Sequence, residues 1–179
     1  MKNGRAALRR LTLAAMLIAM SVVIGIFCKS VLNFANGMAR ITFENLPIIL
    51  GGILLGPVYG GAIGLASDLL SYLLSGQAYA PIPLVTLGAV LVGVCAGLVS
   101  RFVVKEHGSK QTILAGAAAH LVGSMIVKPI GLFSIYGWAV LLRIPIYLAI
   151  APIEILLICL LFKNRGFKKI AEGIDHDLR

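Results

Sequence analysis

The stretch that decides the fold is Arg40–Leu70, with the sequence RITFENLPIILGGILLGPVYGGAIGLASDLL. After an amphipathic beginning, it carries no charged residue between Glu44 and Asp68, and glycines recur throughout. A soluble core does not need a run this apolar and this rich in glycine. In a membrane, small residues let helices approach closely where lipid supplies no hydrophobic drive between them. Gly56-Pro57 divides the run, which predicts two membrane helices joined by a tight turn.

The composition of the whole chain agrees with a membrane protein. Of 179 residues, 59% are hydrophobic and 13% are charged, against about 25% charged in soluble proteins. The apolar segments are continuous and not alternating, which favours helices over a β-barrel. At about 20 residues per crossing, the sequence predicts an all-α polytopic membrane protein with six transmembrane helices in one domain, 1–179. The predicted spans are about 7–27, 43–55, 58–75, 84–104, 112–133 and 138–162.

Basic residues predict the orientation of these spans. Lys2, Arg5, Arg9 and Arg10 lie before the first span or in its first turn, and further basic residues follow the fourth and the sixth. Because positive charge collects on the cytoplasmic side, both termini are predicted to be cytoplasmic. The net charge of +9 therefore reflects orientation and not nucleic-acid binding. The N-terminus is basic and then apolar, as in a signal peptide, but it lacks a clear cleavage site and is predicted to stay as a helix.

Sequence motifs for catalysis are missing. The chain has no HExxH, GxSxG, P-loop or pair of acids at helical spacing, so we expect no enzymatic activity and no ATP hydrolysis by this chain alone. Its three cysteines have no paired spacing, and only one of its three histidines, His120, falls in a predicted span. The sequence therefore predicts neither a metal site nor a cofactor.

Five Asp, Glu, His, Lys or Arg residues fall inside the predicted spans and away from their ends, where a charge costs roughly 2.5–3.5 kcal/mol on insertion scales. Such groups usually face a cavity or a partner. The five residues are Asp68, His120, Lys128, Arg143 and Glu154. Lys128 and Arg143 lie toward the outer ends of the last two spans, where aromatic residues also gather. Cationic donors beside flat rings suit a ligand with a planar apolar body and a carboxylate.

Simpler explanations compete with ligand binding at each position. Tyr136 and Trp138 also fit an interfacial aromatic belt, and Lys128 fits a side chain that extends to the outer headgroups. Asp68 could hold the bundle together through a hydroxyl on its own or a neighbouring helix. His120 could be a hydrogen-bonded packing residue. Glu154 lies eleven positions after Arg143, too far to pair with it directly.

The run from Ile41 to Leu69 resembles the substrate-binding S components of energy-coupling factor (ECF) vitamin transporters, most closely their folate-family branch. Further matches are the proline-rich connection 75–83, the Ala15-xxx-Ala19 pair and the segment RIPIYLAIAPIE at 143–154. The resemblance as a whole extends over nearly the whole chain. The resemblance implies a multi-pass protein of a bacterial cell membrane that captures a vitamin, with folate as the expected ligand, from outside.

The resemblance also implies partners and a site. The partners would be a coupling transmembrane subunit, contacted through Ala15 and Ala19, and two cytoplasmic ATPase subunits. The ligand pocket of the family lies among the outer connections and the outer halves of the later spans. By location, this implies substrate-binding roles for Arg40, Gln77, Tyr79, Thr86, Lys128, Tyr136, Trp138, Arg143 and Tyr147.

Two other functions stay open on the residues alone. One is a stand-alone secondary transporter that couples a small organic solute to protons through Asp68, His120 or Glu154. The other is a membrane scaffold that binds no ligand. The small-residue face of the first helix could likewise pack on a sister helix or dock a second membrane protein.

Overall fold

A computed structural model describes residues 2–34, 39–75, 82–103 and 108–176. At some positions in these ranges, Arg40 among them, it describes the backbone and not the side chain. Helices make up almost all of the described chain. The elements are α1 (Lys2–Val31), β1 (Asn33–Phe34), β2 (Ala39–Arg40), α2 (Asn45–Leu55), α3 (Pro57–Leu74), α4 (Pro83–Leu98), η2 (Val99–Val103), α5 (Ser109–Ala119), η3 (His120–Val127), α6 (Lys128–Tyr136), η4 (Gly137–Leu142), α7 (Arg143–Lys163) and α8 (Arg165–His176).

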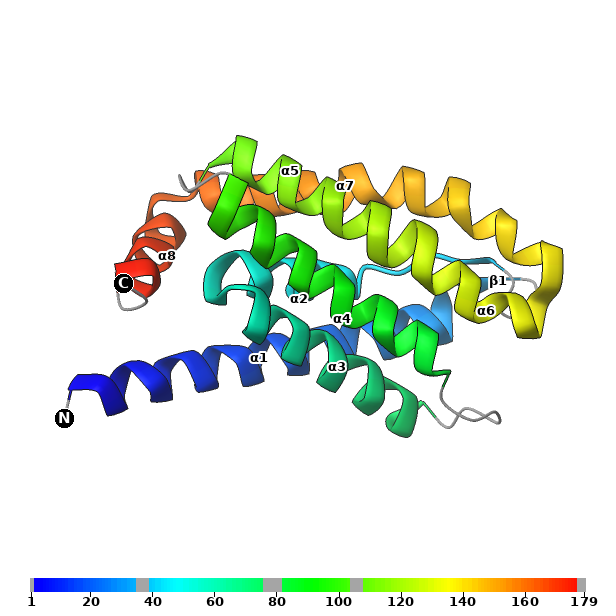
Figure 1. The fold of residues 1–179 in the computed structure, drawn as a ribbon, viewed down its shortest axis with the longest axis horizontal. Helices are drawn as coiled ribbons and strands as arrows, with labels where there is room; N and C mark the ends of the chain where they lie inside the picture. The colour runs from blue at the N-terminus through cyan, green and yellow to red at the C-terminus, as the bar shows by residue number, and fades with distance from the viewer. Residues whose placement is uncertain (1, 35–38, 76–81, 104–107, 177–179) are drawn as a thin grey trace.

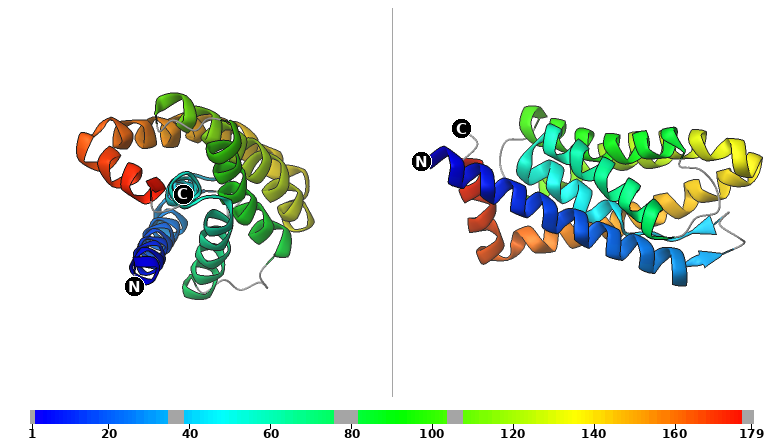
Figure 2. Two further views of the ribbon diagram at one scale, coloured as in Figure 1. Left: turned by 60° about the vertical axis from the view of Figure 1, so that its left-hand side comes forward. Right: turned by 90° about the horizontal axis from the view of Figure 1, so that it is seen from below.

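The helices form a bundle with two distinct ends (Figure 1). We call the end that holds α8 and the start of α1 the terminus end, and the end that holds β1 and β2 the ribbon end. Helix α1 runs toward the ribbon end, α2 runs back, α3 runs forward and α4 back again (Figures 1 and 2). The continuous segment from α5 to α6 then runs to the ribbon end, and α7 returns to the terminus end.

The predicted turn at Gly56-Pro57 is confirmed. Helix α2 ends at Leu55 and α3 begins at Pro57. Gly56 between them has φ 88°, a conformation that residues with a Cβ rarely adopt. All but one residue of α2 are buried, so this short apolar helix lies inside the bundle and the other helices pack around it.

Small residues bring α2, α3 and α4 into backbone contact, as expected for a glycine-rich run in a membrane. A Cβ atom added at Gly93 of α4 would overlap the carbonyl of Gly60 in α3. One added at Gly52 of α2 would come within 2.5 Å of the Gly93 carbonyl oxygen. The glycine-rich run therefore serves helix packing at these positions.

The outer surface of the bundle is apolar. Among the described residues, three stretches are long and apolar enough to cross a membrane, namely Ala6–Val31, Pro83–Val103 and Ser109–Lys163. The last stretch folds back on itself at Gly137, where φ is 53°. Large apolar side chains such as Val58, Leu73 and Phe102 are exposed, which suits contact with lipid. The count of six crossings stays a prediction.

Two elements depart from the sequence expectations. The predicted all-α chain contains a short antiparallel ribbon, in which Asn33 pairs with Arg40 and Phe34 with Ala39. The basic tail, for which no helix was predicted, forms α8. Its Phe167 ring packs edge-on against Phe162 of α7, with ring centroids 5.3 Å apart. This helix is amphipathic, so charged residues interrupt its apolar residues in the sequence and no continuous apolar run indicates a helix there.

Candidate substrate site

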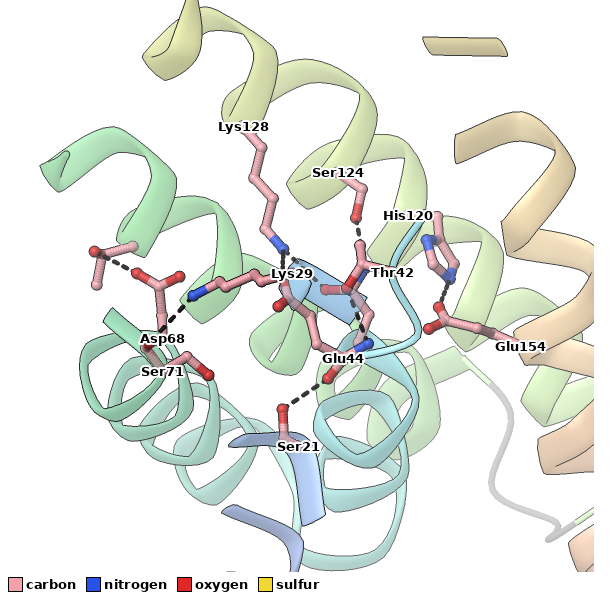
Figure 3. Close-up of polar contacts among 12 residues, drawn as sticks. Ser21, Lys29, Thr42, Glu44, Asp68, Ser71, His120, Ser124, Lys128 and Glu154 are labelled. Atoms are coloured by element: carbon pink, nitrogen blue, oxygen red, sulfur yellow. Dashed lines mark hydrogen bonds and ion pairs between the residues drawn. The ribbon is translucent and has the colours of Figure 1, made fainter. Parts of the chain in front are cut away.

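Lys128 is buried in the bundle and does not extend to headgroups. The residue is 3% exposed, and its Nζ donates a hydrogen bond of 2.9 Å to Asn45 Oδ1. The same nitrogen lies 3.5 Å from Glu44 Oε1 (Figure 3). Of the two explanations that the sequence left open for Lys128, the structure therefore supports an interior role.

The start of α2 is held in place from several sides. The Ser21 hydroxyl of α1 donates to the Glu44 carbonyl oxygen at 2.8 Å. The Asn45 side-chain amide donates to the Ser124 hydroxyl of η3 at 3.3 Å. The Glu44 backbone N–H donates to the Thr42 hydroxyl at 3.3 Å. These bonds place the Glu44 and Asn45 side chains opposite Lys128.

A second set of polar contacts joins α1, α3 and α4 nearby (Figure 3). The Thr86 hydroxyl donates to Asp68 Oδ2 at 2.7 Å, which links the start of α4 to α3. Lys29 Nζ donates to the Ser71 carbonyl oxygen at 3.1 Å and to the Ser75 hydroxyl at 3.3 Å. Asp68 thus holds two helices together through a hydroxyl, which is one of the explanations that the sequence allowed.

A small polar cavity lies between these two sets of contacts. We call it the polar cavity, and it is lined by Ser21, Glu44, Ile48, Ser67, Asp68, Ser71, Ala89 and Lys128. Its empty volume is about 190 Å³ in total, but the part that a solvent molecule could occupy is about 10 Å³, near the size of one water. In the described residues, this cavity is too small to hold a vitamin as it stands.

A larger hollow lies between α3 and α4 and is open to the outside, with an empty volume of about 670 Å³. Its walls are almost wholly apolar, and Thr86 is the polar residue among its lining side chains. An apolar groove on the outer surface of a membrane protein suits a lipid chain better than a charged ligand. The polar cavity is therefore the better candidate site.

The structure pairs two of the other predicted site residues. The Arg143 guanidinium carbon lies 5.3 Å from the centroid of the Tyr136 ring, a cation–π contact. Arg143 is 5% exposed, and Tyr147 is also buried. Trp138 is 77% exposed and packs edge-on against Phe133, which is the position expected of an aromatic belt residue.

The remaining predicted residues fall into three groups. Gln77 and Tyr79 lie outside the described residues, and Arg40 is described only as backbone in β2. Thr86 and Lys128 both belong to the polar contacts around the cavity. Ala15 and Ala19 are exposed on α1, while the adjacent Ala14 is buried.

Sequence reasoning missed the partners of the interior charges. Glu44 and Asn45 appeared only as the beginning of an apolar run, although a charge at the start of a buried helix is itself a signal. His120 Nε2 and Glu154 Oε2 lie 2.8 Å apart, with side chains 2% and 0% exposed. Their remaining ring and carboxyl atoms have no hydrogen-bond partner in the described part of the chain. This buried pair ties η3 to α7.

The architecture defines a class of protein. An apolar-surfaced helical bundle that encloses charged side chains toward one end is a multi-pass membrane protein equipped to handle a polar solute. The sequence profile of the family described as "ECF transporter, substrate-specific component" matches residues 9–174. The chain therefore belongs to this family. No curated protein matches the sequence.

Membership in the family defines the general role. The chain is a transport protein and not an enzyme, it takes a small substrate, and it works with an energy-coupling module. The family match does not name the substrate.

Proposed function

We propose that the chain captures folate outside a bacterial cell and delivers it inward through a coupling transmembrane subunit and two cytoplasmic ATPase subunits. The observation that supports a capture site most strongly is the burial of Lys128 beside Glu44 and Asn45. Burying an ammonium group has an effective penalty of several kcal/mol. This cost is understandable if Lys128 exchanges Glu44 and Asn45 for groups of a ligand when the ligand binds.

The charges satisfy one another in the present arrangement. Lys128 contacts Glu44 and Asn45, and Asp68 accepts from Thr86. Folate brings a flat ring system with N–H donors and a ring carbonyl, and these groups could replace the internal partners of Glu44, Asp68 and Lys128. The bundle would open at the ribbon end, where the connection between α1 and α2 lies. Arg143 and the Tyr136 ring then offer a second cationic and aromatic contact for the outer part of the ligand.

We further propose six crossings with both termini in the cytoplasm. Support comes from the basic residues, because Arg101, Lys110 and Lys163 belong to elements that meet at the terminus end. Positive charge marks the cytoplasmic side. The ribbon end would then face outward, and the polar cavity would lie in the outer half of the bundle.

We propose that Ala15 and Ala19 contact the coupling subunit. Both are exposed on α1, and the apolar side chains of Leu11, Met16 and Val23 are exposed near them. A small-residue face on an outer helix lets a second membrane helix approach closely. The loaded bundle would tilt against this partner and release folate inside.

Uptake of labelled folate by cells that express the chain tests this function. Uptake should need both the coupling subunit and the ATPases, while binding to the purified chain should need no ATP. Uptake that persists without the ATPases, but stops when the proton gradient is collapsed at constant ATP, would instead identify a proton-coupled secondary transporter.

A further inference from the structure

Ser67 is a buried hydroxyl without a partner. Its side chain is 2% exposed and lines the polar cavity. Its Oγ makes no hydrogen bond with any described residue. Leaving a buried hydroxyl unpaired is unfavourable, because the group loses its hydrogen bonds to water and gains none in return. The cavity beside this hydroxyl has room for about one water, so a water, or a ligand group that displaces it, would supply the missing partner.

The walls of the polar cavity present more acceptors than cations. The carboxylates of Glu44 and Asp68 line it from two helical elements, and Lys128 is the cationic residue among its lining side chains. Gly25 makes room for the first carboxylate, because a Cβ atom there would come 3.0 Å from Glu44 Oε2. A ligand that brought only a carboxylate to this point would meet two like charges, which disfavour it.

A ligand with N–H groups fits these walls better. An amino group beside a ring N–H can donate two parallel hydrogen bonds to one carboxylate, a strong and directional arrangement. A neighbouring ring carbonyl can accept from the Lys128 ammonium. The Ser67 hydroxyl can then donate to, or accept from, the same ring edge.

We propose that Glu44, Ser67 and Asp68 form the acceptor wall of the substrate site. This wall selects a ligand whose buried end is a 2-amino-4-oxopyrimidine-type ring edge. The inference rests on the proposed capture of folate, whose ring system carries such an edge, and it adds which end of the ligand enters first. The carboxylates of the ligand would then stay toward the ribbon end. To admit the ring, Lys128 and Glu44 must separate, because the cavity has little free space.

The test uses two small probes that differ at one group. Pterin carries the 2-amino group, whereas lumazine has a carbonyl oxygen in its place. Isothermal titration of each into the purified full chain should give at least tenfold tighter binding for pterin. Equal affinities, or no binding of either probe, would overturn the acceptor wall.

Variants locate the effect within the site. We expect Ser67→Ala to weaken pterin binding about fivefold, the worth of one neutral hydrogen bond. Asp68→Asn should weaken it at least tenfold, because a charge-assisted bond is lost. The control Ser30→Ala removes an exposed hydroxyl that bonds the Ile26 carbonyl of its own helix at 3.0 Å, and it should change nothing. Unchanged pterin affinity in both cavity variants would also overturn the proposal.

Failures of the two proposals can be told apart. If folic acid binds but pterin and lumazine bind equally, folate capture stands and the acceptor wall is wrong. If pterin binds selectively and folic acid does not, the wall stands and the ligand is a smaller molecule. If Asp68→Asn does not fold, because its bond to Thr86 is weakened, the comparison of probes on the unmodified chain still decides.

Discussion

Lys128 Nζ lies 2.9 Å from Asn45 Oδ1, and these two residues are 83 positions apart in the sequence. Their hydrogen bond ties the first turn of α2 to the start of α6. Glu44, next to Asn45, gives the same ammonium group an ionic partner at 3.5 Å. Lys128 therefore holds the N-terminal end of α2, the central helix of the bundle, in place. From the sequence alone, a side chain that extends to the lipid headgroups was an equally good explanation of this lysine.

Lys128→Met should destabilise the bundle. The change keeps the apolar stem but leaves Asn45 Oδ1 and the Glu44 carboxylate without their cation, at a cost of about 1–3 kcal/mol. Thermal unfolding in detergent measures the effect. Lys110→Met, at an exposed position, is the matched control. Equal melting temperatures for both variants would show that the Lys128 contacts contribute nothing to stability.

The His120–Glu154 pair should behave as one unit. Removing either partner alone, by His120→Leu or Glu154→Met, leaves a buried polar group and should destabilise by about 3–5 kcal/mol. Replacing both should restore most of the loss, because an apolar pair of similar volume needs no polar partner. A double-mutant cycle from unfolding measurements gives the coupling. Additive effects of the two changes would contradict a direct pairing.

Gly93→Ala should disrupt the packing of α3 on α4. The added Cβ would overlap the Gly60 carbonyl, so the two helices must separate. This should lower the free energy of unfolding by about 1–3 kcal/mol. Gly173→Ala in α8 is the control, since its Cβ would meet nothing within 4 Å, and alanine favours a helix by roughly 0.5–1 kcal/mol. Melting temperatures should therefore fall for the first variant and hold or rise for the second.

Ala15→Trp together with Ala19→Trp should block uptake and leave ligand binding intact. Both positions are exposed, so the bulky rings would obstruct a docked partner and not the interior of the bundle. Met16→Trp, at an exposed site about 100° around the helix, is the control and should transport normally. Loss of ligand binding along with uptake would instead point to a folding defect.

Local patterns predicted the parts of the fold that local chemistry controls. Gly56-Pro57 marked the turn between α2 and α3, and the recurring glycines of the run Arg40–Leu70 marked helices that pack closely. The interior position of Lys128 was one of two alternatives, because the presence of a single lysine in an apolar segment does not indicate whether its side chain is buried or extends to the headgroups. Its partners could not be predicted, since contacts between distant helices depend on how each helix is rotated in the bundle.

The same limit applies to the other buried charges. His120 and Glu154 were both recognised as costly in lipid, but their pairing joins two helices whose relative rotation the sequence does not specify. Helix α8 was missed for a different reason. Its apolar face is interrupted by charges at every turn, and its packing on the bundle is seen in the contacts of Phe167 and the burial of Ala171.

The most direct test of the account is equilibrium binding of labelled folic acid to the purified chain, without coupling subunits and without ATP. We expect saturable binding with one ligand per chain, and competition by excess unlabelled folic acid. A chain that unfolds cooperatively in the same detergent, and yet binds no folic acid and carries no copurified vitamin detectable by mass spectrometry, would contradict vitamin capture.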